Sequence, residues 1–501
     1  MKLRRQYAAK LTASVINLLV GMVVIGFVPR TLGPESYGRY EFMSNFFLQV
    51  KSFLDMGTST CFYTRLSQRQ GDVGLIMFYK RLLLGASVLM IGGALLLAGT
   101  PVNGWLWGGE SMLLVGLAAC YAAVVWWLDT IRKMVDAWHL TVQGEMFYAF
   151  SRVLALLILV AVVWGWGLGL EGYFLYQIAA LLLIIVVLTH LLSKRPLETK
   201  SELPPQPARA YIREFWDYSH PLVAYAAVGV LVGLADRWVL QTQAGAIEQG
   251  FFGLAYQVGA MCFLFTSAMT QLLSREFATA WAKQDMERMR SMFRRIVPML
   301  YTVAAYFSIF IAWHAEDVVW LLGGQAWEPG VLAMAIMVLY PMHQTYGQLS
   351  GSIYYATGET RLYRNIGIAG MAAGLPVMLW LVMPTESGGL GLGAVGLALK
   401  MVVLQFIFVN VGLWFNTRLL SLNFWSFFVH QLIVPSVFLV CVFASSTLGS
   451  LLELPRFSQF LLAGVGYTFL VAGMILLLPQ LAGLQRNDIG MATHNILSSK
   501  K

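Results

Sequence analysis

Long apolar segments separated by short polar stretches recur along the whole chain. Each runs for roughly 17–25 residues, the length that an α-helix needs to cross a bilayer. Their apolar character continues around the helical wheel, so they are not amphipathic surface helices. The segments lie at 11–29, 41–63, 82–99, 111–130, 148–166, 172–192, 217–236, 249–273, 296–314, 330–356, 362–383, 391–415, 425–447 and 458–480. The pattern predicts an all-α polytopic membrane protein with about 14 transmembrane helices.

The placement of Lys and Arg predicts the topology of these spans. If the N-terminus is cytoplasmic, the inside segments carry 27 of the 34 basic residues and the outside loops carry 4. This asymmetry follows the positive-inside rule, and one span more or fewer would invert every later loop. The outside residues are Arg30, Arg39, Arg237 and Arg456. We therefore expect an even number of spans with both termini on the cytoplasmic side.

Composition excludes several other classes of protein. Hydrophobic residues make up 58% of the chain and charged residues 12%, against roughly 25% charged residues in soluble domains. The net charge of +9 does not indicate nucleic-acid binding, because the basic residues lie between spans. The four cysteines fit neither a disulfide framework nor a zinc site. The first apolar run ends in Pro29-Arg30 without a small-residue cleavage site, so we expect it to stay as the first span.

The spans group into two lobes. The longest loop is rich in proline and mixed charge, which is typical of a flexible cytoplasmic linker, and it follows the sixth span. The predicted parts are an N-terminal six-helix lobe (1–195), the linker (196–216), a C-terminal six-helix lobe (217–420), two additional transmembrane helices (421–482) and a cytoplasmic tail (483–501). A weak repeat supports two pseudo-repeated lobes, a common plan for transporters. Gly38-Arg39-Tyr40-Glu41-Phe42 follows the first span, and Gly250-Phe251-Phe252-Gly253-Leu254 follows the seventh.

Enzyme signatures are absent from the sequence. It contains no G-x-x-x-x-G-K-S/T phosphate loop, no HExxH zinc motif and no nucleophile elbow. The seven histidines are scattered and lack metal-ligand spacing. We therefore expect no catalytic residues, no metal and no cofactor.

Charged residues inside the spans are the candidate site. A charge at membrane depth is costly unless it faces water or a partner. Lys51 and Asp55 share one helix face and are able to pair, Arg152 lies near the start of the fifth span, and Lys400 lies within the twelfth. Arg152 could instead extend to the cytoplasmic surface, and Lys51 and Asp55 could be a structural pair. A cavity lined by Lys51, Arg152 and Lys400 would be electropositive and suit an anionic phosphate or pyrophosphate headgroup.

Residues 29–40, PRTLGPESYGRY, resemble the loop between the first two spans of Wzx-type polysaccharide flippases. That family belongs to the polysaccharide transporter branch of the superfamily that also contains multidrug-and-toxin exporters and the lipid II flippase. Other elements resemble the family in the same order: LDMG at 54–57, YSHPL at 218–222, Asp236-Arg237 closing the seventh span, GFF at 250–252, LLGG at 321–324 and GET at 358–360. Phe252 departs from the tyrosine that is usual at that place.

The resemblance implies a flippase of the bacterial inner, or cytoplasmic, membrane. It would move an undecaprenyl-diphosphate-linked oligosaccharide between leaflets for the biosynthesis of a surface polysaccharide. That polysaccharide would be the O-antigen of lipopolysaccharide, a capsule or an exopolysaccharide. Two lobes would enclose a cavity that opens to either face, with Asp55 and Asp236 as candidates for ion or proton coupling. Asp55, Asp236 and Arg237 are together the candidates for such coupling or for structural pairing. The partners implied are the lipid-linked substrate, membrane lipids, a polysaccharide polymerase and glycosyltransferases.

Three alternatives stay open at this point. The first is a cation-coupled multidrug or small-molecule exporter of the same superfamily, for which twelve spans would be usual. The second is a membrane polysaccharide polymerase or ligase, which would normally show a large periplasmic loop that this chain lacks. The third is a non-catalytic partner within a polysaccharide assembly machine.

Overall fold

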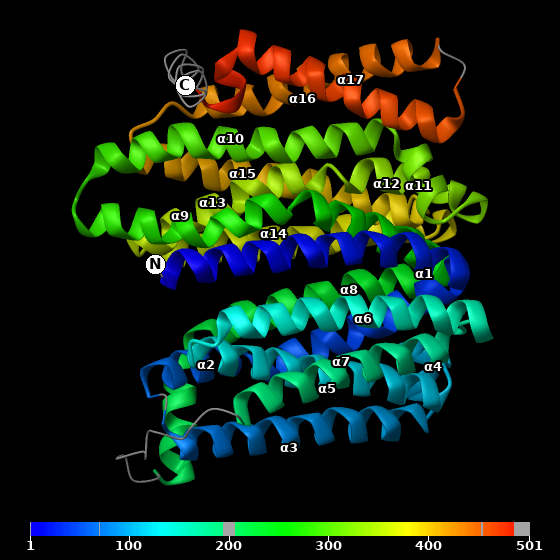
Figure 1. Ribbon diagram of the computed structural model, residues 1–501, viewed down its shortest axis with the longest axis vertical. Coiled ribbons are helices and arrows are strands. Elements are labelled where there is room, and N and C mark those ends of the chain that lie inside the picture. The colour runs from blue at the N-terminus through cyan, green and yellow to red at the C-terminus, as the bar shows by residue number, and fades with distance from the viewer. Residues whose placement is uncertain (1, 70, 194–205, 452–453, 485–501) are drawn as a thin grey trace. The chain divides into compact units, whose positions relative to one another are not determined.

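The computed structural model describes residues 2–69, 71–193, 206–451 and 454–484. These residues form helices and connecting turns, with no strand among them. The chain divides into two compact units, Met1–Gly250 (unit 1) and Phe251–Lys501 (unit 2). Figure 1 shows the helices of each unit packed side by side along their lengths. The all-α fold predicted from the apolar segments is confirmed.

Eight helices begin in unit 1. They are α1 (Lys2–Asp55), α2 (Thr58–Gln68), α3 (Val73–Ala98), α4 (Val102–Trp107), α5 (Met112–Ala137), α6 (Thr141–Trp166), α7 (Leu170–Ser193) and α8 (Ala208–Cys262), of which the last continues into unit 2. Unit 2 contains α9 (Leu264–Ala282), α10 (Met286–Trp313), α11 (Ala315–Leu322), η1 (Gln325–Gly330), α12 (Val331–Met337), α13 (Tyr340–Thr357), α14 (Thr360–Val382), η2 (Thr385–Ser387), α15 (Gly393–Leu419), α16 (Phe424–Ser450), α17 (Arg456–Leu477) and η3 (Pro479–Ala482).

Nine helices within the described ranges are long and apolar enough to cross a membrane, or ten if the bent helix pair in α8 forms one span. They are α3, α5, α6, α7, α10, α14, α15, α16 and α17. Each coincides with one of the predicted spans, so the chain is a multi-pass membrane protein. The total of about 14 spans and the inside location of both termini stay predictions.

The other five predicted spans fall on interrupted helices. The span predicted at 41–63 ends at Asp55, because Met56 and Gly57 both have positive φ (38° and 85°) before α2 begins. The span predicted at 330–356 is divided between α12 and α13. The spans at 11–29, 217–236 and 249–273 lie on α1, α8 and the α8–α9 junction.

The two longest helices each contain a glycine break. Gly33 in α1 has φ 73° and ψ 170°, and Gly245 in α8 has φ 88° and ψ 177°. These angles lie outside the helical region and suit glycine, which has no Cβ to clash with the backbone. Each long helix is therefore two helices that meet at the break. The two breaks occupy matching places in the two halves of the predicted repeat.

Two further glycines form close reciprocal contacts beside these breaks. A Cβ on Gly38 would lie 1.7 Å from the backbone oxygen of Ala246, and a Cβ on Gly250 would lie 2.3 Å from the backbone oxygen of Pro34. Neither position has room for a side chain, since real Cβ atoms do not approach so closely. Gly38 and Gly250 head the two repeated stretches found in the sequence, so the reciprocal geometry supports that repeat.

The helical segment 208–220 packs on the junction of α2 and α3. Glu214 forms ion pairs with Arg65 (Oε1 to Nε, 2.8 Å) and with Arg69 (Oε1 to Nη2, 2.6 Å). The Tyr211 hydroxyl donates to Asp72 Oδ1 at 2.9 Å. The Glu214 carboxylate raises the pKa of the Arg69 guanidinium by accepting its hydrogen bond. The linker predicted at 196–216 is thus helical from Ala208 onward, where it belongs to α8. Residues 194–205 lie outside the described ranges.

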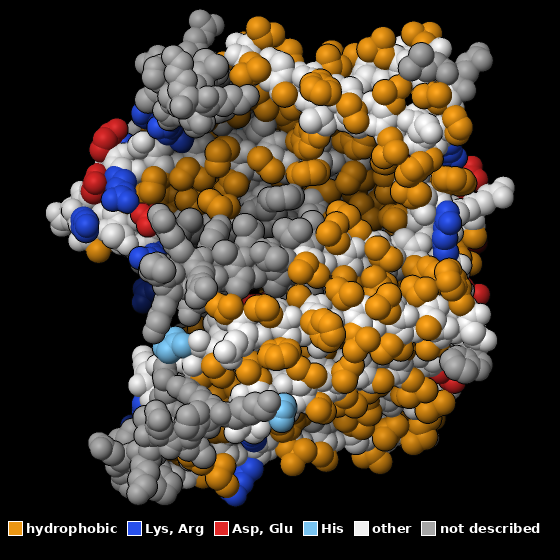
Figure 2. All heavy atoms as spheres, in the orientation of Figure 1, with side chains coloured by type: hydrophobic (Ala, Val, Ile, Leu, Met, Phe, Trp, Pro, Cys, Tyr) orange, Lys and Arg blue, Asp and Glu red, His pale blue; other side chains and the backbone are white. Residues whose placement is uncertain are grey.

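Apolar side chains cover much of the surface that Figure 2 shows. In α16 and α17, large apolar residues are exposed along the whole helix length, including Phe443 (57%), Val465 (54%) and Phe469 (75%). Water would not stabilise so much apolar surface, whereas lipid chains do. These helices therefore present a lipid-facing surface.

Candidate functional site

An ion pair joins α1 to α5 in unit 1. Lys51 Nζ donates to Asp129 Oδ2 at 2.8 Å, and the two side chains are 16% and 43% exposed. The two residues are far apart in the sequence, so their pairing depends on the packing of the helices. Lys51 thus meets a partner on another helix rather than Asp55 on its own helix.

Asp55 instead stabilises the start of α2. Its carboxylate accepts hydrogen bonds from Thr58 Oγ1 (2.8 Å), the Ser59 backbone N–H (2.9 Å) and Ser59 Oγ (2.7 Å). The positive φ values of Met56 and Gly57 turn the chain so that this carboxylate reaches the free N–H groups of the next helix. The LDMG element of the sequence therefore forms a capped break between two helices.

A second lysine, Lys133 of α5, reaches the break between α1 and α2. Lys133 Nζ donates to Ser59 Oγ at 2.6 Å, and Ser59 in turn donates to Asp55. Asp129 and Lys133 lie one turn apart on α5, so Lys51 of α1 and Lys133 of α5 come to the same contact, and each ammonium group is held by an oxygen atom. We name Lys51, Asp55, Ser59, Asp129 and Lys133 the α1–α5 charge cluster.

Arg152 of α6 lies among apolar and aromatic neighbours at the contact with α1 and α7. It lines a cavity of about 40 Å³ together with Val20, Tyr176 and Gln177. Its Nε atom is buried and has no hydrogen-bond partner within the described residues. The neighbouring Arg132 of α5 pairs with Glu145 (Nη2 to Oε1, 3.1 Å). Arg152 therefore points into the helix bundle with unfilled hydrogen-bonding capacity.

Arg237 lies in the interior of unit 1. It is 6% exposed, and Tyr37 in the same unit is 2% exposed. Glu41 is 7% exposed. Asp236 is the preceding residue of α8 and is half-buried. The predicted end of the seventh span at this pair is not a helix end, because α8 continues to the break at Gly245.

Lys400 is a buried lysine of α15 in unit 2. It is 7% exposed and packs against Gly374 of α14. A Cβ on Gly374 would lie 2.9 Å from Lys400 Cε and 3.3 Å from Nζ, so glycine leaves the space that the ammonium group occupies. Lys51 and Arg152 belong to unit 1 and Lys400 to unit 2. One cavity lined by all three stays a prediction.

Neutral polar side chains connect α9 to α13 in unit 2. Thr270 Oγ1 donates to Gln348 Oε1 at 2.9 Å, and the hydroxyl oxygens of Ser274 and Ser352 lie 2.7 Å apart. The donors on α9 are four residues apart, and their partners on α13 follow the same period, so both sets face each other. Sequence reasoning missed this contact, although the spacing of hydroxyl residues within an apolar pattern was visible.

The same kind of contact joins α15 to its neighbours. The Gln405 side-chain amide donates to Gln344 of α13. Asn410 and Gln431 of α16 exchange two hydrogen bonds, with Gln431 Nε2 to Asn410 Oδ1 at 2.9 Å and Asn410 Nδ2 to Gln431 Oε1 at 3.3 Å. Both residues are buried. These amide and hydroxyl contacts satisfy polar groups that lipid would leave without partners.

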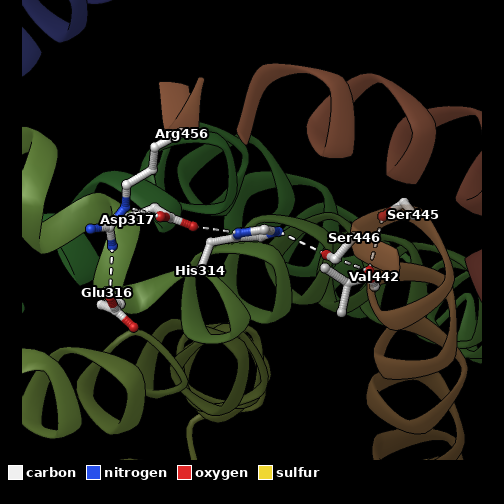
Figure 3. A network of polar contacts seen from close by, with 7 residues as sticks. All are labelled: His314, Glu316, Asp317, Val442, Ser445, Ser446 and Arg456. Atoms are coloured by element: carbon white, nitrogen blue, oxygen red, sulfur yellow. Dashed lines mark hydrogen bonds and ion pairs between the residues drawn. The ribbon is translucent and has the colours of Figure 1, made fainter. Parts of the chain in front are cut away.

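A further polar network lies where α10 meets α11 (Figure 3). His314 lies between Asp317 (Nδ1 to Oδ2, 2.9 Å) and Ser446 of α16 (Nε2 to Oγ, 3.0 Å). Arg456 at the start of α17 donates to Asp317 Oδ1 at 2.6 Å and to Glu316 Oε1 at 2.9 Å. The network therefore connects the additional helices α16 and α17 to α11. Sequence reasoning treated Arg456 only as an outside charge.

The described residues contain no group of three or more His, Cys, Asp or Glu side chains that could hold a metal ion. The histidines for which contacts are given bind protein groups, as His314 does with Asp317 and Ser446. The chemistry that the clusters offer is charge pairing and hydrogen bonding at membrane depth.

Comparison with solved structures shows which fold these helices form. No protein-family model and no curated protein matches the chain. The lipid II flippase MurJ in an inward closed conformation matches with a TM-score of 0.64 and 11% identity, over 94% of this chain and 98% of that chain. An inward-facing multidrug resistance MATE family transporter of the MOP superfamily matches with a TM-score of 0.62 and 14% identity, over 82% and 94%.

A MOP superfamily transporter from Pyrococcus furiosus also matches, with a TM-score of 0.54 and 14% identity, over 83% of this chain and 96% of that chain. At such low identity the likeness concerns the fold. The superfamily fold that the sequence resemblance implied is confirmed, whereas the Wzx-type family stays a prediction. This chain is thus a multi-pass membrane protein with the fold of the MOP superfamily transporters.

Proposed function

We propose that the protein is a flippase that moves an undecaprenyl-diphosphate-linked oligosaccharide from the inner to the outer leaflet of the cytoplasmic membrane. The length of the structural match supports a flippase over an exporter. The lipid II flippase matches 94% of this chain and the multidrug transporter 82%. The difference corresponds to about 60 residues, which is about the length of α16 to η3. This likeness and the loop at 29–40 support the proposal of a lipid-linked substrate.

The α1–α5 charge cluster suits the diphosphate group of such a substrate. Lys51 and Lys133 are held by Asp129 and Ser59 at 2.8 and 2.6 Å, so their positive charges are positioned before substrate arrives. The Asp129 carboxylate and the Ser59 hydroxyl lower the cost of placing Lys51 and Lys133 at membrane depth. A diphosphate would compete for the ammonium groups, because phosphate oxygens are strong hydrogen-bond acceptors.

Arg152 and Lys400 are the proposed additional contacts to the anionic headgroup. Arg152 has a buried Nε without a hydrogen-bond partner within the described residues, and a guanidinium can bind phosphate through two N–H groups at once. Lys400 is held in space left by Gly374. The apolar outer surface of helices such as α16 and α17 leaves the lipid tail in the bilayer.

We place the proposed coupling to a proton or cation at Asp55 and Asp236. Asp55 accepts three hydrogen bonds at the α1–α2 break. Protonation would weaken these bonds, since a neutral carboxyl is a poorer acceptor than a carboxylate. The break would then loosen, which connects the charge of Asp55 to the geometry of the two helices.

Surface polysaccharide provides the cellular test. Arg152→Ala and Lys400→Ala should each lower polysaccharide output at unchanged protein level, while Lys80→Ala, which removes an exposed lysine, should leave it unchanged. Normal output in both variants would refute the headgroup contacts proposed for Arg152 and Lys400. Efflux of a cationic dye, with no effect of the protein on polysaccharide, would instead favour the exporter.

A further inference from the structure

A polar hollow lies beside α11, at the end of unit 2 where α17 begins. Its volume is about 250 Å³, and the polar residues that line it are Glu316, Gln325, Glu328 and Arg456, with Trp320 beside them. This volume is far larger than the about 10–15 Å³ that a single water requires, so the hollow has room for a small organic ligand. The charge asymmetry of the loops predicts that this end of unit 2 faces outside. We name the hollow the α11–η1 pocket.

The walls of the α11–η1 pocket are built rigidly. Gly324 has φ 82°, which turns η1 back over α11. A Cβ on Gly323 would lie 2.3 Å from the Trp327 side chain, so the ring of Trp327 packs directly on the glycine backbone. Trp327 is 1% exposed. The pocket therefore exists because two glycines and a buried tryptophan fix the turn, and its shape does not depend on a mobile loop.

The cationic wall of the pocket is also fixed. The Arg456 guanidinium is held by Asp317 at 2.6 Å and Glu316 at 2.9 Å, and Asp317 is itself held by His314 (Figure 3). The guanidinium carbon lies 5.4 Å from the centre of the Trp320 ring. Such preorganised groups bind a ligand without losing much side-chain freedom on binding.

The opposite wall offers free hydrogen-bonding groups. Glu328 and Gln325 of η1 are exposed, and no hydrogen bond or ion pair engages the Glu328 carboxylate in the described contacts. Trp320 is 41% exposed, which leaves apolar ring surface available. An apolar ring beside carboxylate, amide and guanidinium groups is suited to a sugar, which has C–H faces and hydroxyl edges.

The charges of the pocket restrict the class of ligand further. The carboxylates of Glu316, Asp317 and Glu328 outnumber the single guanidinium of Arg456, so an anionic sugar would be repelled. A metal ion is disfavoured because these carboxylates do not converge into a metal-binding group within the described residues. We propose that the α11–η1 pocket binds one neutral or amino-bearing sugar ring, with the ring on Trp320 and its polar edge on Glu328 and Gln325.

This pocket is separate from the α1–α5 charge cluster and requires no translocation, so it goes beyond the proposed function. Its test is ligand-observed saturation-transfer NMR on the purified full chain, in a detergent without a sugar headgroup. The probes are methyl glucoside, glucosamine and glucuronate. Methyl glucoside and glucosamine should receive saturation, and glucuronate should bind at least about tenfold more weakly, since removing or reversing one charge contact is worth about tenfold.

Two variants and two controls locate the binding. Glu328→Gln should weaken glucosamine about tenfold and methyl glucoside less, because only the amine loses a charged partner. Trp320→Ala should weaken both by a similar factor. Glu386→Gln in η2 and Trp380→Ala in α14 change exposed residues outside the pocket and should bind as the parent chain does.

The proposal is overturned if no probe receives saturation, if glucuronate binds as well as glucosamine, or if both pocket variants bind normally. Thermal unfolding of every variant shows whether the fold is retained, and the methyl glucoside response of Glu328→Gln provides an internal check on folding. A chain that binds these sugars but moves no lipid-linked oligosaccharide would refute the proposed function alone. A chain that moves the lipid but binds none of the sugars would refute the pocket alone.

Discussion

The two units of the protein stabilise their polar interiors in different ways. Unit 1 uses charges: Lys51 and Lys133 of the α1–α5 charge cluster are held by Asp129 and Ser59. Unit 2 connects α9, α13, α15 and α16 mainly through amides and hydroxyls, as between Asn410 and Gln431. Within the described helices of unit 2, Lys400 is an exception, because it is a buried charge rather than an amide or a hydroxyl.

The difference matters because charges and amides have different costs and uses in a membrane. A charged pair is expensive to bury and responds strongly to a charged ligand. Neutral amides and hydroxyls contribute about 0.6 kcal/mol per contact between membrane helices and are indifferent to ligand charge. We infer that unit 1 carries the main headgroup-binding chemistry and that the neutral contacts of unit 2 hold helices together.

The largest expected effect is that of breaking the Lys51–Asp129 pair. Lys51→Met should reduce lipid translocation at least about tenfold and lower the free energy of unfolding by about 1 kcal/mol, because Asp129 loses its partner but is 43% exposed. Lys51→Met/Asp129→Leu should recover stability but not translocation. Thermal unfolding and translocation measured on the same preparations separate the two. Recovery of translocation in the double variant would make Lys51 a purely structural residue.

The next largest effect is expected at Lys400, the buried lysine of unit 2. Gly374→Ala places a methyl group 2.9 Å from Lys400 Cε, so the ammonium group has to move. We expect Lys400→Met and Gly374→Ala to lower translocation about three- to tenfold. Gly473→Ala in α17 is the matched control, since a Cβ there meets nothing within 4 Å. Equal activity of the Gly374 and Gly473 variants would contradict a role for the position of Lys400.

The neutral contacts of unit 2 should affect stability rather than transport. Asn410→Leu leaves the 2% exposed Gln431 without its amide partner, so the free energy of unfolding should fall by about 1–3 kcal/mol. Asn410→Leu/Gln431→Met should recover most of that loss. Translocation per folded molecule should stay within about twofold of the parent protein. A large loss of translocation at normal stability would show that unit 2 amides also contact substrate.

The smallest effect is expected at the exposed end of unit 2. The Arg456 side chain is 39% exposed, and its partners Glu316 and Asp317 are 70% and 26% exposed. Exposed ion pairs contribute about 0–1 kcal/mol, so Arg456→Ala should change thermal unfolding little and less at high salt. A loss as large as that of Asn410→Leu would show that this network is needed to hold α17.

The sequence predicted the spans better than it predicted the contacts between them. Apolar length locates a helix such as α15 (Gly393–Leu419) within a few residues of the predicted 391–415, because crossing a bilayer imposes that length. The repeat headed by Gly38 and Gly250 stays a prediction, which the close backbone contacts at these glycines support.

The site was predictable only in part. Lys51 stood out as an interior charge, but local spacing suggested Asp55 as its neighbour, whereas the partner is Asp129 on another helix. Thr270 and Gln348 were missed because neutral polar residues cost too little in a span to interrupt the apolar pattern. Arg456 was seen as a loop charge because nothing local in the sequence connects it to Asp317.

The central claim is that the protein moves lipid-linked oligosaccharide between leaflets. The most direct measurement reconstitutes the purified full chain in liposomes that contain a fluorescent undecaprenyl-diphosphate oligosaccharide in both leaflets. A membrane-impermeant quencher is then added outside. We predict that quenching proceeds beyond the outer-leaflet fraction in liposomes that contain the parent protein, at least about tenfold more slowly with Lys51→Met/Asp129→Leu, and stops at the outer-leaflet fraction in empty liposomes. Quenching that stops at the outer-leaflet fraction with the parent protein would contradict the account.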